Sequence, residues 1–276
     1  MIFRVEMTAL NSGAVMPQLG FGCMIPQAQT SEAVTHAIEV GYRSLDTATD
    51  YGNEIEVGRA IAAADVPRDE VFVTTKLWNS DHGREKTLRA FDASLNALGL
   101  DHVDLYLIHW PVPAWDLYVE TWKALVEIQQ DGRARSIGVS NFQIPHLERI
   151  VEATGVVPAV NQIELHPLLQ QRELRAFHAR TGIVTEAWSP LAQGMALSPP
   201  TVRELAERHE RSPGQIVLRW HLQLGSVAIP KSVTPLRIAE NFDVLDFELD
   251  EHEMDRLQAL DAGTRTGPHP DTFIED

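Results

Sequence analysis

Residues Val103 to Pro111 read Val-Asp-Leu-Tyr-Leu-Ile-His-Trp-Pro, a nearly continuous apolar run that ends in a histidine. Such a run is typical of a strand that is covered on both faces, because a strand with one face in water alternates apolar and polar residues. Apolar residues with helical spacing lie on each side of it, at 91–98 and 122–128, and a glycine follows each helical segment. A buried strand between two amphipathic helices predicts a parallel sheet with helical connections.

The same alternation of short strands and longer helices extends along most of the chain. An open doubly wound sheet that binds a dinucleotide usually has a glycine-rich turn after its first strand, but Gly20-Phe21-Gly22-Cys23-Met24-Ile25 lacks the third glycine of that motif. Eight strand–helix units in 276 residues favour a closed barrel instead. The expected strands are Gln18–Gly22, Tyr42–Asp46, Val71–Lys76, Val103–His109, Arg135–Ser140, Ala159–Glu164, Ile183–Trp188 and Ser226–Ile229.

We therefore expect a protein of the α/β class, with a single (β/α)8 TIM-barrel domain that spans residues 1–276. An N-terminal β-hairpin ending at Met16-Pro17 is expected before the barrel, and Ser31 is the expected N-cap of the first helix. Two segments, Ser212–Leu224 and Asp250–Leu260, are expected to be extra helices outside the eight units.

The composition disfavours several functional classes. With 23 basic and 39 acidic residues, the chain has a formal net charge of −16, which opposes nonspecific binding to nucleic acid or anionic membranes. No apolar run approaches the ~20 residues that a membrane-spanning helix needs, and the first residues lack the pattern of a secretion signal. The single cysteine, Cys23, cannot close an internal disulfide or build a thiolate zinc site. We expect a cytoplasmic protein that binds neither nucleic acid nor membrane.

Four polar residues fall where barrel enzymes carry their reactive groups, at the carboxyl ends of the strands and in the loops that follow. Asp46, Lys76 and His109 end the second, third and fourth expected strands, and Tyr51 lies in the loop after Asp46. Each residue alone has an ordinary structural explanation. A lysine that ends a buried strand needs a partner, however, because burying an unpaired ammonium is strongly unfavourable. We expect Asp46 to pair with Lys76 and all four side chains to meet at one mouth of the barrel.

This set of side chains suits the polarisation and protonation of a carbonyl group. One ammonium about 4 Å from a phenol, at an effective dielectric constant of roughly 20, stabilises the phenolate by about 4 kcal/mol, or about three units of pKa. We therefore expect Lys76 to lower the pKa of Tyr51 from ~10 toward neutrality, with Asp46 partly offsetting that effect. Tyr51 would then be the general acid, and His109 would orient the carbonyl oxygen.

Several long motifs surround these positions. They are Gly41-Tyr42-Arg43-Ser44-Leu45-Asp46-Thr47-Ala48, Tyr51-Gly52-Asn53-Glu54, Thr75-Lys76-Leu77-Trp78, His109-Trp110-Pro111, Ile137-Gly138-Val139-Ser140-Asn141-Phe142 and Ile229-Pro230-Lys231-Ser232. Together they resemble the aldo-keto reductase family from about Met7 to the C-terminal tail. The segment from Val157 to Pro167 and the ending Ala262-Gly263 with His269-Pro270-Asp271 are most similar to the bacterial 2,5-diketo-D-gluconic acid reductases of that family.

The resemblance implies an oxidoreductase that reduces aldehydes and ketones, such as small dicarbonyls or keto-sugars, with Asp46, Tyr51, Lys76 and His109 as catalytic residues. It also implies NADPH, bound in an extended form across the barrel mouth. The residues implied for the nicotinamide carboxamide are Ser140, Asn141 and Gln162. Trp188 would stack on the nicotinamide ring, and the loop 189–194 would cover the pyrophosphate.

The resemblance places the adenosine end of the cofactor beyond the last strand. Lys231, Ser232 and Arg237 would bind the 2′-phosphate, since arginine offers a bidentate fork and lysine a point charge. Glu240 and Asn241 would contact the adenine. The complete implied cofactor-binding set is Cys23, Asp46, Ser140, Asn141, Gln162, Trp188, Ser189, Pro190, Leu191, Gln193, Gly194, Lys231, Ser232, Val233, Arg237, Glu240 and Asn241.

The substrate-binding residues implied by the resemblance are Met24, Trp78, His109 and Trp110. Three positions depart from the family pattern. Trp188 stands where tyrosine is common and can still stack, Met24 stands where a larger aromatic residue is common, and Thr234 replaces a basic residue of close relatives. The missing basic residue weakens the expected preference for NADPH over NADH.

Two alternatives assign the same residues to other functions. The chain would be a nucleotide-sensing or scaffold protein if it bound NADPH without useful turnover. It would be a metal-dependent hydrolase if His109, His166 and Asp46 held a metal, which a lysine at the site and the absence of a His-x-His pair disfavour. We expect no metal, a small-molecule carbonyl substrate and a monomer.

Overall fold

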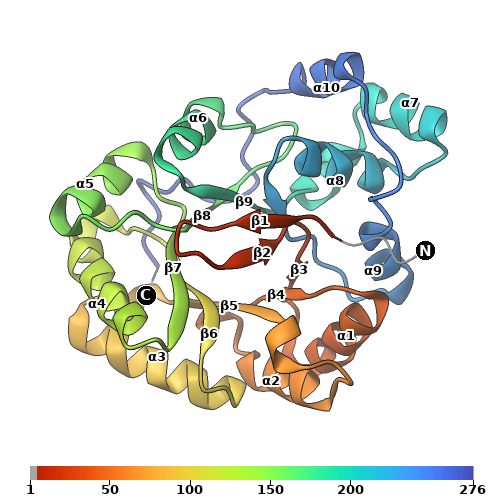
Figure 1. The fold of residues 1–276 in the computed structure, drawn as a ribbon. Coiled ribbons are helices and arrows are strands. Elements are labelled where there is room, and N and C mark those ends of the chain that lie inside the picture. The colour runs from red at the N-terminus through yellow and green to blue at the C-terminus, as the bar shows by residue number, and fades with distance from the viewer. Residues whose placement is uncertain (1–4, 276) are drawn as a thin grey trace.

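Eight parallel strands close into a barrel in the computed structural model, which describes residues 5–275 (Figure 1). Residues 1–4 and residue 276 lie outside the described residues. The prediction that the first residues lack a secretion signal therefore falls partly outside them. The strands follow one another in chain order and are β3 Phe21–Gly22, β4 Ser44–Asp46, β5 Phe72–Leu77, β6 Val103–Ile108, β7 Ala134–Ser140, β8 Val160–Glu164, β9 Val184–Trp188 and β10 Val227–Ala228. This arrangement confirms the predicted (β/α)8 barrel and each of its eight strands.

Hydrogen bonds between the first and last strands close the barrel. The amides of Gly20 and Gly22 donate to the carbonyl oxygens of Ala228 and Pro230 at 2.9 and 3.1 Å. A Cβ at Gly22 would lie 2.8 Å from the carbonyl oxygen of Ile229, so only glycine permits this close approach of two backbones. The first and last strands are shorter than the sequence predicted, although Leu19 still pairs with Ala228 in an isolated bridge.

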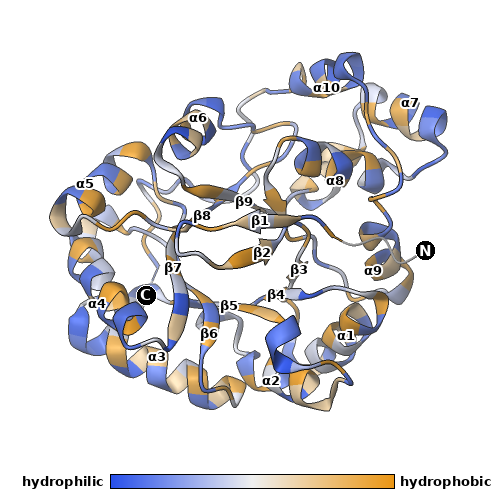
Figure 2. Ribbon diagram, viewed as in Figure 1, coloured by the Kyte–Doolittle hydropathy of each residue, from blue (hydrophilic) through white to orange (hydrophobic). Residues whose placement is uncertain are grey.

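Helices surround the barrel, with apolar and polar residues alternating along them as expected for elements with one face buried and one in water (Figure 2). None of them within residues 5–275 is long and apolar enough to cross a membrane. The helices are α1 Gln27–Val40, α2 Glu54–Ala63, α3 Arg84–Leu98, α4 Tyr118–Gln130, α5 Ile144–Thr154, α6 Arg172–Thr181, α7 Pro200–His209, α8 Pro213–Gln223, α9 Pro235–Phe242 and α10 Glu251–Gln258.

Two predictions about the helices need correction. The first helix begins at Gln27 with Pro26 as its N-cap, so Ser31 lies inside it and is not a cap. The segment expected as the first extra helix forms α8, but α8 packs against β10 and occupies the place of a regular barrel helix. The added helix before it is α7, which the sequence analysis missed, and it packs against the second added helix, α10. The count of two extra helices is confirmed, and the identity of one changes.

The predicted N-terminal hairpin is present and closes the amino-terminal end of the barrel. Its strands β1 Met7–Ala9 and β2 Val15–Pro17 are antiparallel and lie across that end in Figure 1. Leu10 and Met16 are buried against interior side chains such as Leu105, and the hydroxyl groups of Ser12 and Ser136 lie 2.7 Å apart. Because this end is filled, only the carboxyl end of the barrel is left for a site.

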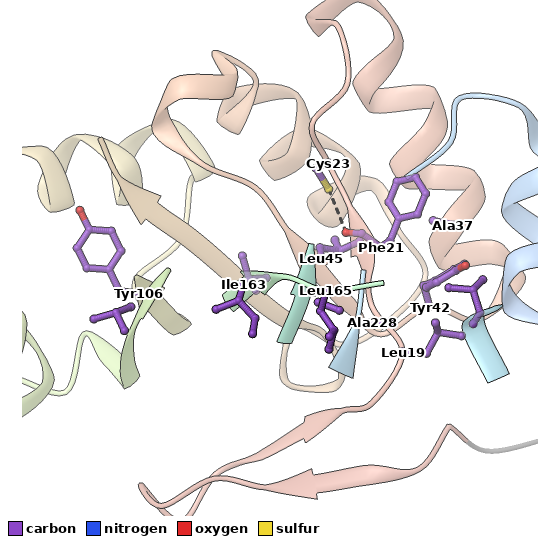
Figure 3. Close-up of a cluster of buried hydrophobic side chains, with 14 of the residues drawn as sticks. Leu19, Phe21, Cys23, Ala37, Tyr42, Leu45, Tyr106, Ile163, Leu165 and Ala228 are labelled. Atoms are coloured by element: carbon purple, nitrogen blue, oxygen red, sulfur yellow. Dashed lines mark hydrogen bonds between the residues drawn. The ribbon is translucent and has the colours of Figure 1, made fainter. Parts of the chain in front are cut away.

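The main core lies between the strands and the surrounding helices. Phe21 and Leu45 project from β3 and β4 toward α1, where they meet Ala37 and Tyr42 (Figure 3). The rings of Phe21 and Tyr42 have centroids 5.5 Å apart. This packing holds the carboxyl ends of β3 and β4 in a fixed position, which matters because Asp46 ends β4.

Candidate active site

The predicted ion pair of Asp46 and Lys76 is present at the carboxyl ends of β4 and β5. The Lys76 ammonium donates to Asp46 Oδ1 at 2.5 Å and to the carbonyl oxygen of Thr47 at 2.9 Å. Both side chains are almost wholly buried, at 0% and 2% exposure. Burial, the largest single effect, lowers the pKa of Lys76. The charge and hydrogen bond of Asp46, together with Tyr51 and Glu186, raise it by more, so the lysine stays charged.

Tyr51 lies beside this pair on a short 3-10 helix, Thr49–Tyr51, that follows β4. The Lys76 ammonium donates to the Tyr51 hydroxyl oxygen at 3.3 Å, and the Thr49 hydroxyl donates to the carbonyl oxygen of Lys76 at 3.0 Å. Gly52 ends the turn with φ of 62°, a left-handed conformation that glycine adopts without strain. The loop therefore delivers Tyr51 to the ammonium, as the sequence predicted.

The predicted fall in the pKa of Tyr51 is wrong for this structure. Burial, the largest effect, raises the pKa of Tyr51 to about 12, although Lys76 lowers it and Asp46 raises it further. The sequence argument counted the ammonium and underestimated both the loss of water and the carboxylate 2.5 Å from that ammonium. Tyr51 is consequently protonated at neutral pH, and because its oxygen accepts from Lys76, its own O–H is free to donate to another molecule.

His109 completes the group of four residues that the sequence singled out. Its ring centroid lies 5.8 Å from that of Tyr51 and 5.1 Å from that of Trp78, in near-perpendicular arrangements. Burial, and then the charge of Lys76, hold the pKa of His109 well below its usual value, so the imidazole is neutral. A neutral imidazole has one N–H donor, which suits a group that orients a carbonyl oxygen.

The next three predicted residues lie in one hydrogen-bonded layer at the ends of β7 and β8. Ser140 Oγ donates to the carbonyl oxygen of Gln162 at 2.9 Å, and Asn141 Nδ2 donates to Ser140 Oγ at 3.1 Å and to the carbonyl oxygen of His109 at 3.0 Å. All three of the predicted side chains are buried. Asn141 thus links the predicted nicotinamide contacts to the backbone of His109.

Gln162 has a second function that the sequence analysis missed. Its amide Nε2 donates across the barrel to Asp46 Oδ2 and also to Glu186 Oε2, both at 2.8 Å. These two bonds use both amide hydrogens, so only the amide oxygen is left for a ligand. Glu186 on β9 is wholly buried. The sequence analysis missed it because a charged residue is ordinarily expected at the surface and not in the interior of a barrel.

Trp188 and the loop after it form the next part of the mouth. Trp188 ends β9 and is half-buried, and its indole N–H donates to Asn141 Oδ1 at 2.8 Å. Three non-glycine residues of the following loop have positive φ: Ser189 at 50°, Ala192 at 50° and Gln193 at 53°. Such residues are uncommon and gather at ligand-binding loops, so the backbone here agrees with a binding role for 189–194.

The predicted 2′-phosphate residues lie on the segment after β10. Lys231 and Arg237 are exposed, whereas Ser232 is buried and its hydroxyl accepts the amide of Thr234 at 3.1 Å. On α9, Asn241 is buried and Glu240 is half-buried. This segment forms a separate patch. Among the described residues, no side-chain hydrogen bond joins it to Asp46, Tyr51, Lys76 or His109.

An aromatic wall stands on the other side of His109. Trp110 is nearly buried and its ring lies 4.4 Å from that of Phe273, which also lies 6.4 Å from Trp78. Phe273 belongs to the C-terminal tail and is a lining residue that the sequence analysis did not single out. Met24, by contrast, is 66% exposed, which places it at the rim of any pocket.

The C-terminal tail is fastened to the barrel by a buried carboxylate. Glu164 Oε1 accepts the hydroxyl and the amide of Thr266, at 2.7 and 2.5 Å, and lies 3.0 Å from His166 Nε2. Gly267 follows directly, and a Cβ on it would lie 2.5 Å from Cη2 of Trp188. The tail is therefore held against the residue that ends β9.

One further predicted position, Cys23, is occupied by structural contacts. The backbone of Cys23 is used within the protein. Its amide donates to the backbone carbonyl oxygen of Asp46 at 2.8 Å, and its carbonyl oxygen accepts from Asn53 Nδ2 at 2.7 Å. Its thiol donates to the carbonyl oxygen of Phe21 at 3.6 Å (Figure 3), and burial raises its pKa. Asn53 is a missed residue that ties the Tyr51 loop to the Cys23 loop.

The metal-dependent alternative finds no support in the arrangement of its ligands. His166 pairs with Glu164 at the base of the tail, and Asp46 is committed to Lys76 and Gln162. Within residues 5–275 no group of three or more histidine, cysteine, aspartate or glutamate side chains is placed to hold a metal ion.

Comparison with known proteins gives a consistent result. The model of the Aldo/keto reductase family matches residues 18–262. The chain is 55% identical over 269 residues to the methylglyoxal reductase DkgA of Escherichia coli, with 96% of each chain covered. A crystal structure of an aldo/keto reductase from Brucella melitensis is 53% identical with a TM-score of 0.92, covering 95% of this chain and 100% of that one. A variant of the protein Gox0644 in complex with NADPH is 49% identical with a TM-score of 0.95, covering 98% and 99%.

Proposed function

Because the chain belongs to the aldo/keto reductase family, we propose that it reduces aldehydes and ketones to alcohols, with NADPH as the reductant and Tyr51 as the proton donor. It would thus be an oxidoreductase acting on CH–OH groups. The observation that carries the proposal is the buried series of contacts from Asp46 to Lys76 and on to the Tyr51 hydroxyl, at 2.5 and 3.3 Å. This series ends at the carboxyl mouth of the barrel beside a neutral His109.

The residues around the mouth fit NADPH. Lys231 and Arg237 are exposed and take no part in the ion pairs found among residues 5–275, whereas nearby Arg211 is paired with Asp243 at 2.9 Å. Two cations without carboxylate partners suit a phosphate group. Trp188 would hold the nicotinamide ring, and the amide oxygen of Gln162 remains to accept from its carboxamide. When bound, NADPH supplies a hydride to the carbonyl carbon.

The protein's own residues would complete the reaction at the carbonyl oxygen. His109 and Tyr51 each offer one hydrogen to that oxygen, which polarises the carbonyl and fixes its position. As negative charge develops on the oxygen, Tyr51 transfers its proton to it. The resulting phenolate is then stabilised by Lys76, which already donates to the Tyr51 oxygen at 3.3 Å.

We propose small, polar carbonyl compounds such as dicarbonyls or keto-sugars, for example 2,5-diketo-D-gluconate, as substrates. Support comes from the methylglyoxal reductase among the relatives and from the aromatic wall of Trp78, Trp110 and Phe273. We also propose that the chain acts as a monomer with a single barrel domain in the cytoplasm. Support for the single domain is that the hairpin, strands, helices and tail all pack on one barrel.

The decisive experiment measures NADPH consumption by the wild type and by Tyr51→Phe over a panel of aldehydes, dicarbonyls and keto-sugars. Loss of a general acid typically slows the reaction about 10²- to 10⁴-fold. We expect a kcat loss of that size in Tyr51→Phe, with the dissociation constant for NADPH changed less than about twofold, because the phenol oxygen is the only atom removed.

Two outcomes would contradict the proposal. Turnover of Tyr51→Phe close to that of the wild type on a good aldehyde would remove Tyr51 from its role. Quenching of NADPH fluorescence without NADPH consumption on any carbonyl in the panel would instead favour the nucleotide-binding scaffold.

A further inference from the structure

Glu186 is a buried acid in the barrel interior that the proposed reaction does not use. It lies on β9 in register with Gln162 on β8, and its exposure is 0%. Its Oε2 accepts from Gln162 at 2.8 Å, whereas its Oε1 is buried and has no hydrogen-bond partner among the described residues. A buried acid with one unpartnered oxygen needs an explanation, since unpaired buried polar atoms are costly.

Glu186 belongs to the same network as the predicted active-site residues. Gln162 donates one amide hydrogen to Glu186 Oε2 and the other to Asp46 Oδ2, each at 2.8 Å. Asp46 in turn holds Lys76, which donates to Tyr51 at 3.3 Å. Each link is a direct hydrogen bond, so the state of Glu186 affects the position of the amide that orients Asp46.

The charges of this network show which acid holds a proton. Two carboxyl groups share a single ammonium, and Asp46 contacts that ammonium directly at 2.5 Å. Glu186 contacts only a neutral amide, and Val227, its partner in register on β10, is apolar. The charged groups that face Glu186 are therefore Asp46, which repels its negative form, and Lys76, which attracts it from farther away. The Glu186 proton would reside on Oε1, because Oε2 accepts from Gln162.

We propose that Glu186 is a positioning residue for carbonyl reduction: as a neutral acid it holds Gln162 against Asp46, and its ionisation weakens proton donation by Tyr51. This inference rests on the proposed function and deepens it by naming a regulator of the same site. Burial, and after it the charge of Asp46, raise the pKa of Glu186 to about 8, which agrees with the geometry. Ionisation of Glu186 gives the network two carboxylates for one ammonium. One negative charge is then uncompensated, and that charge makes Tyr51 a weaker acid.

The test compares the pH dependence of kcat in the wild type and in Glu186→Gln, which keeps the shape of a neutral acid but cannot ionise. For the wild type we expect kcat on a good aldehyde to fall about fivefold as the pH rises through 8, as a weaker general acid slows proton transfer. In Glu186→Gln we expect wild-type kcat at neutral pH within about twofold and no fall up to pH 9.5, with KM for the aldehyde unchanged. The matched control is Glu253→Gln, which removes a buried carboxylate on α10 and should keep the wild-type fall.

A second measurement does not depend on turnover or on the variant. Ligand-free wild type carrying ¹³C-labelled glutamate carboxyl groups should show one carboxyl signal that titrates near pH 8. Absence of any glutamate carboxyl titrating above pH 7 would overturn the proposal, as would an alkaline fall in kcat that persists unchanged in Glu186→Gln. Failure of the proposed function would show differently, as absence of turnover with the carboxyl titration intact.

Discussion

The Tyr51 hydroxyl lies 3.3 Å from an ammonium and still has a pKa raised to about 12. The Lys76 ammonium donates to one carboxylate oxygen, of Asp46, and to one carbonyl oxygen, of Thr47. Both of these oxygens lie closer to the ammonium than the phenol oxygen does. The ammonium therefore does little to ionise the resting phenol. In the proposed reaction the same ammonium would stabilise the phenolate formed by proton transfer, so this contact would favour donation without releasing the proton beforehand.

At the level of single residues, substitution of Arg237 tests most directly whether the protein prefers NADPH over NADH. Truncation of a charge-assisted contact to a phosphate costs about 1.5–3 kcal/mol, or roughly 10- to 100-fold in affinity. We expect Arg237→Ala to raise KM for NADPH by that factor and to change KM for NADH less than about twofold, because NADH lacks the 2′-phosphate. Lys231→Ala should act in the same direction.

The control for this prediction is Arg203→Ala on α7, which removes an exposed arginine from a different helix. Its KM values for both cofactors should equal those of the wild type. Equal increases for NADPH and NADH in Arg237→Ala would contradict the assignment of this side chain to the 2′-phosphate.

The candidate residues whose positions could be predicted are those at the ends of strands. Asp46, Lys76 and His109 each follow a buried apolar run, so their level in the barrel can be read from the sequence. Glu186 could not be found in this way, because in Thr185-Glu186-Ala187 it lies within a strand where a charged residue ordinarily marks the outer face. The pKa of Tyr51 could not be predicted either, since burial depends on loops distant in sequence.

At the level of elements, the eight strands were predictable and helix α7 was not. It begins at Pro200, within the stretch Ser198-Pro199-Pro200, which resembles a loop because proline interrupts helices. The structure uses Pro200 in the first turn, where proline lacks only a hydrogen bond that no helix can make there. A proline thus indicates the end of a helix that precedes it, but it is compatible with the start of a helix that follows it.

The C-terminal tail gives a prediction that belongs to one element. A Cβ on Gly267 would lie 2.5 Å from the Trp188 indole, so Gly267→Ala forces the tail or the ring to move. Overpacking of this kind costs about 1–3 kcal/mol of folding free energy. We expect urea unfolding to show that loss of stability. Fluorescence titration should show a dissociation constant for NADPH that is about fivefold higher, equivalent to ~1 kcal/mol of lost stacking.

Gly214→Ala on α8 is the matched control, because a Cβ there meets no atom closer than 3.7 Å. We expect no loss of stability in that variant and unchanged NADPH affinity. If Gly267→Ala binds NADPH as the wild type does, Trp188 either does not stack on the nicotinamide or is not held by the tail.

At the level of the whole molecule, buried titratable groups set how stability depends on pH. Burial is the largest effect in each case: it lowers the pKa of His82 to about 4 and those of His178 and His221 to about 3, and it raises that of Glu186 to about 8. His178 shows why the neutral form is required, because its Nε2 lies 2.9 Å from the Asn161 amide nitrogen and its Nδ1 lies 2.8 Å from the Thr185 hydroxyl.

These groups predict that the protein loses stability in mild acid. Below pH ~6.5 the unfolded forms of these three imidazoles and of His109, whose folded pKa is also held well below its usual value, take up protons that the folded ones cannot. Unfolding releases the Glu186 proton, so the unfolded state gains about three protons in all. The free energy of unfolding should therefore fall by ~4 kcal/mol per pH unit as the pH drops from about 6 to 5. Urea titrations at successive pH values measure this slope. Glu186→Gln removes the opposing group and should steepen the slope to about four protons, and a slope near zero in the wild type would contradict the neutral state of these histidines.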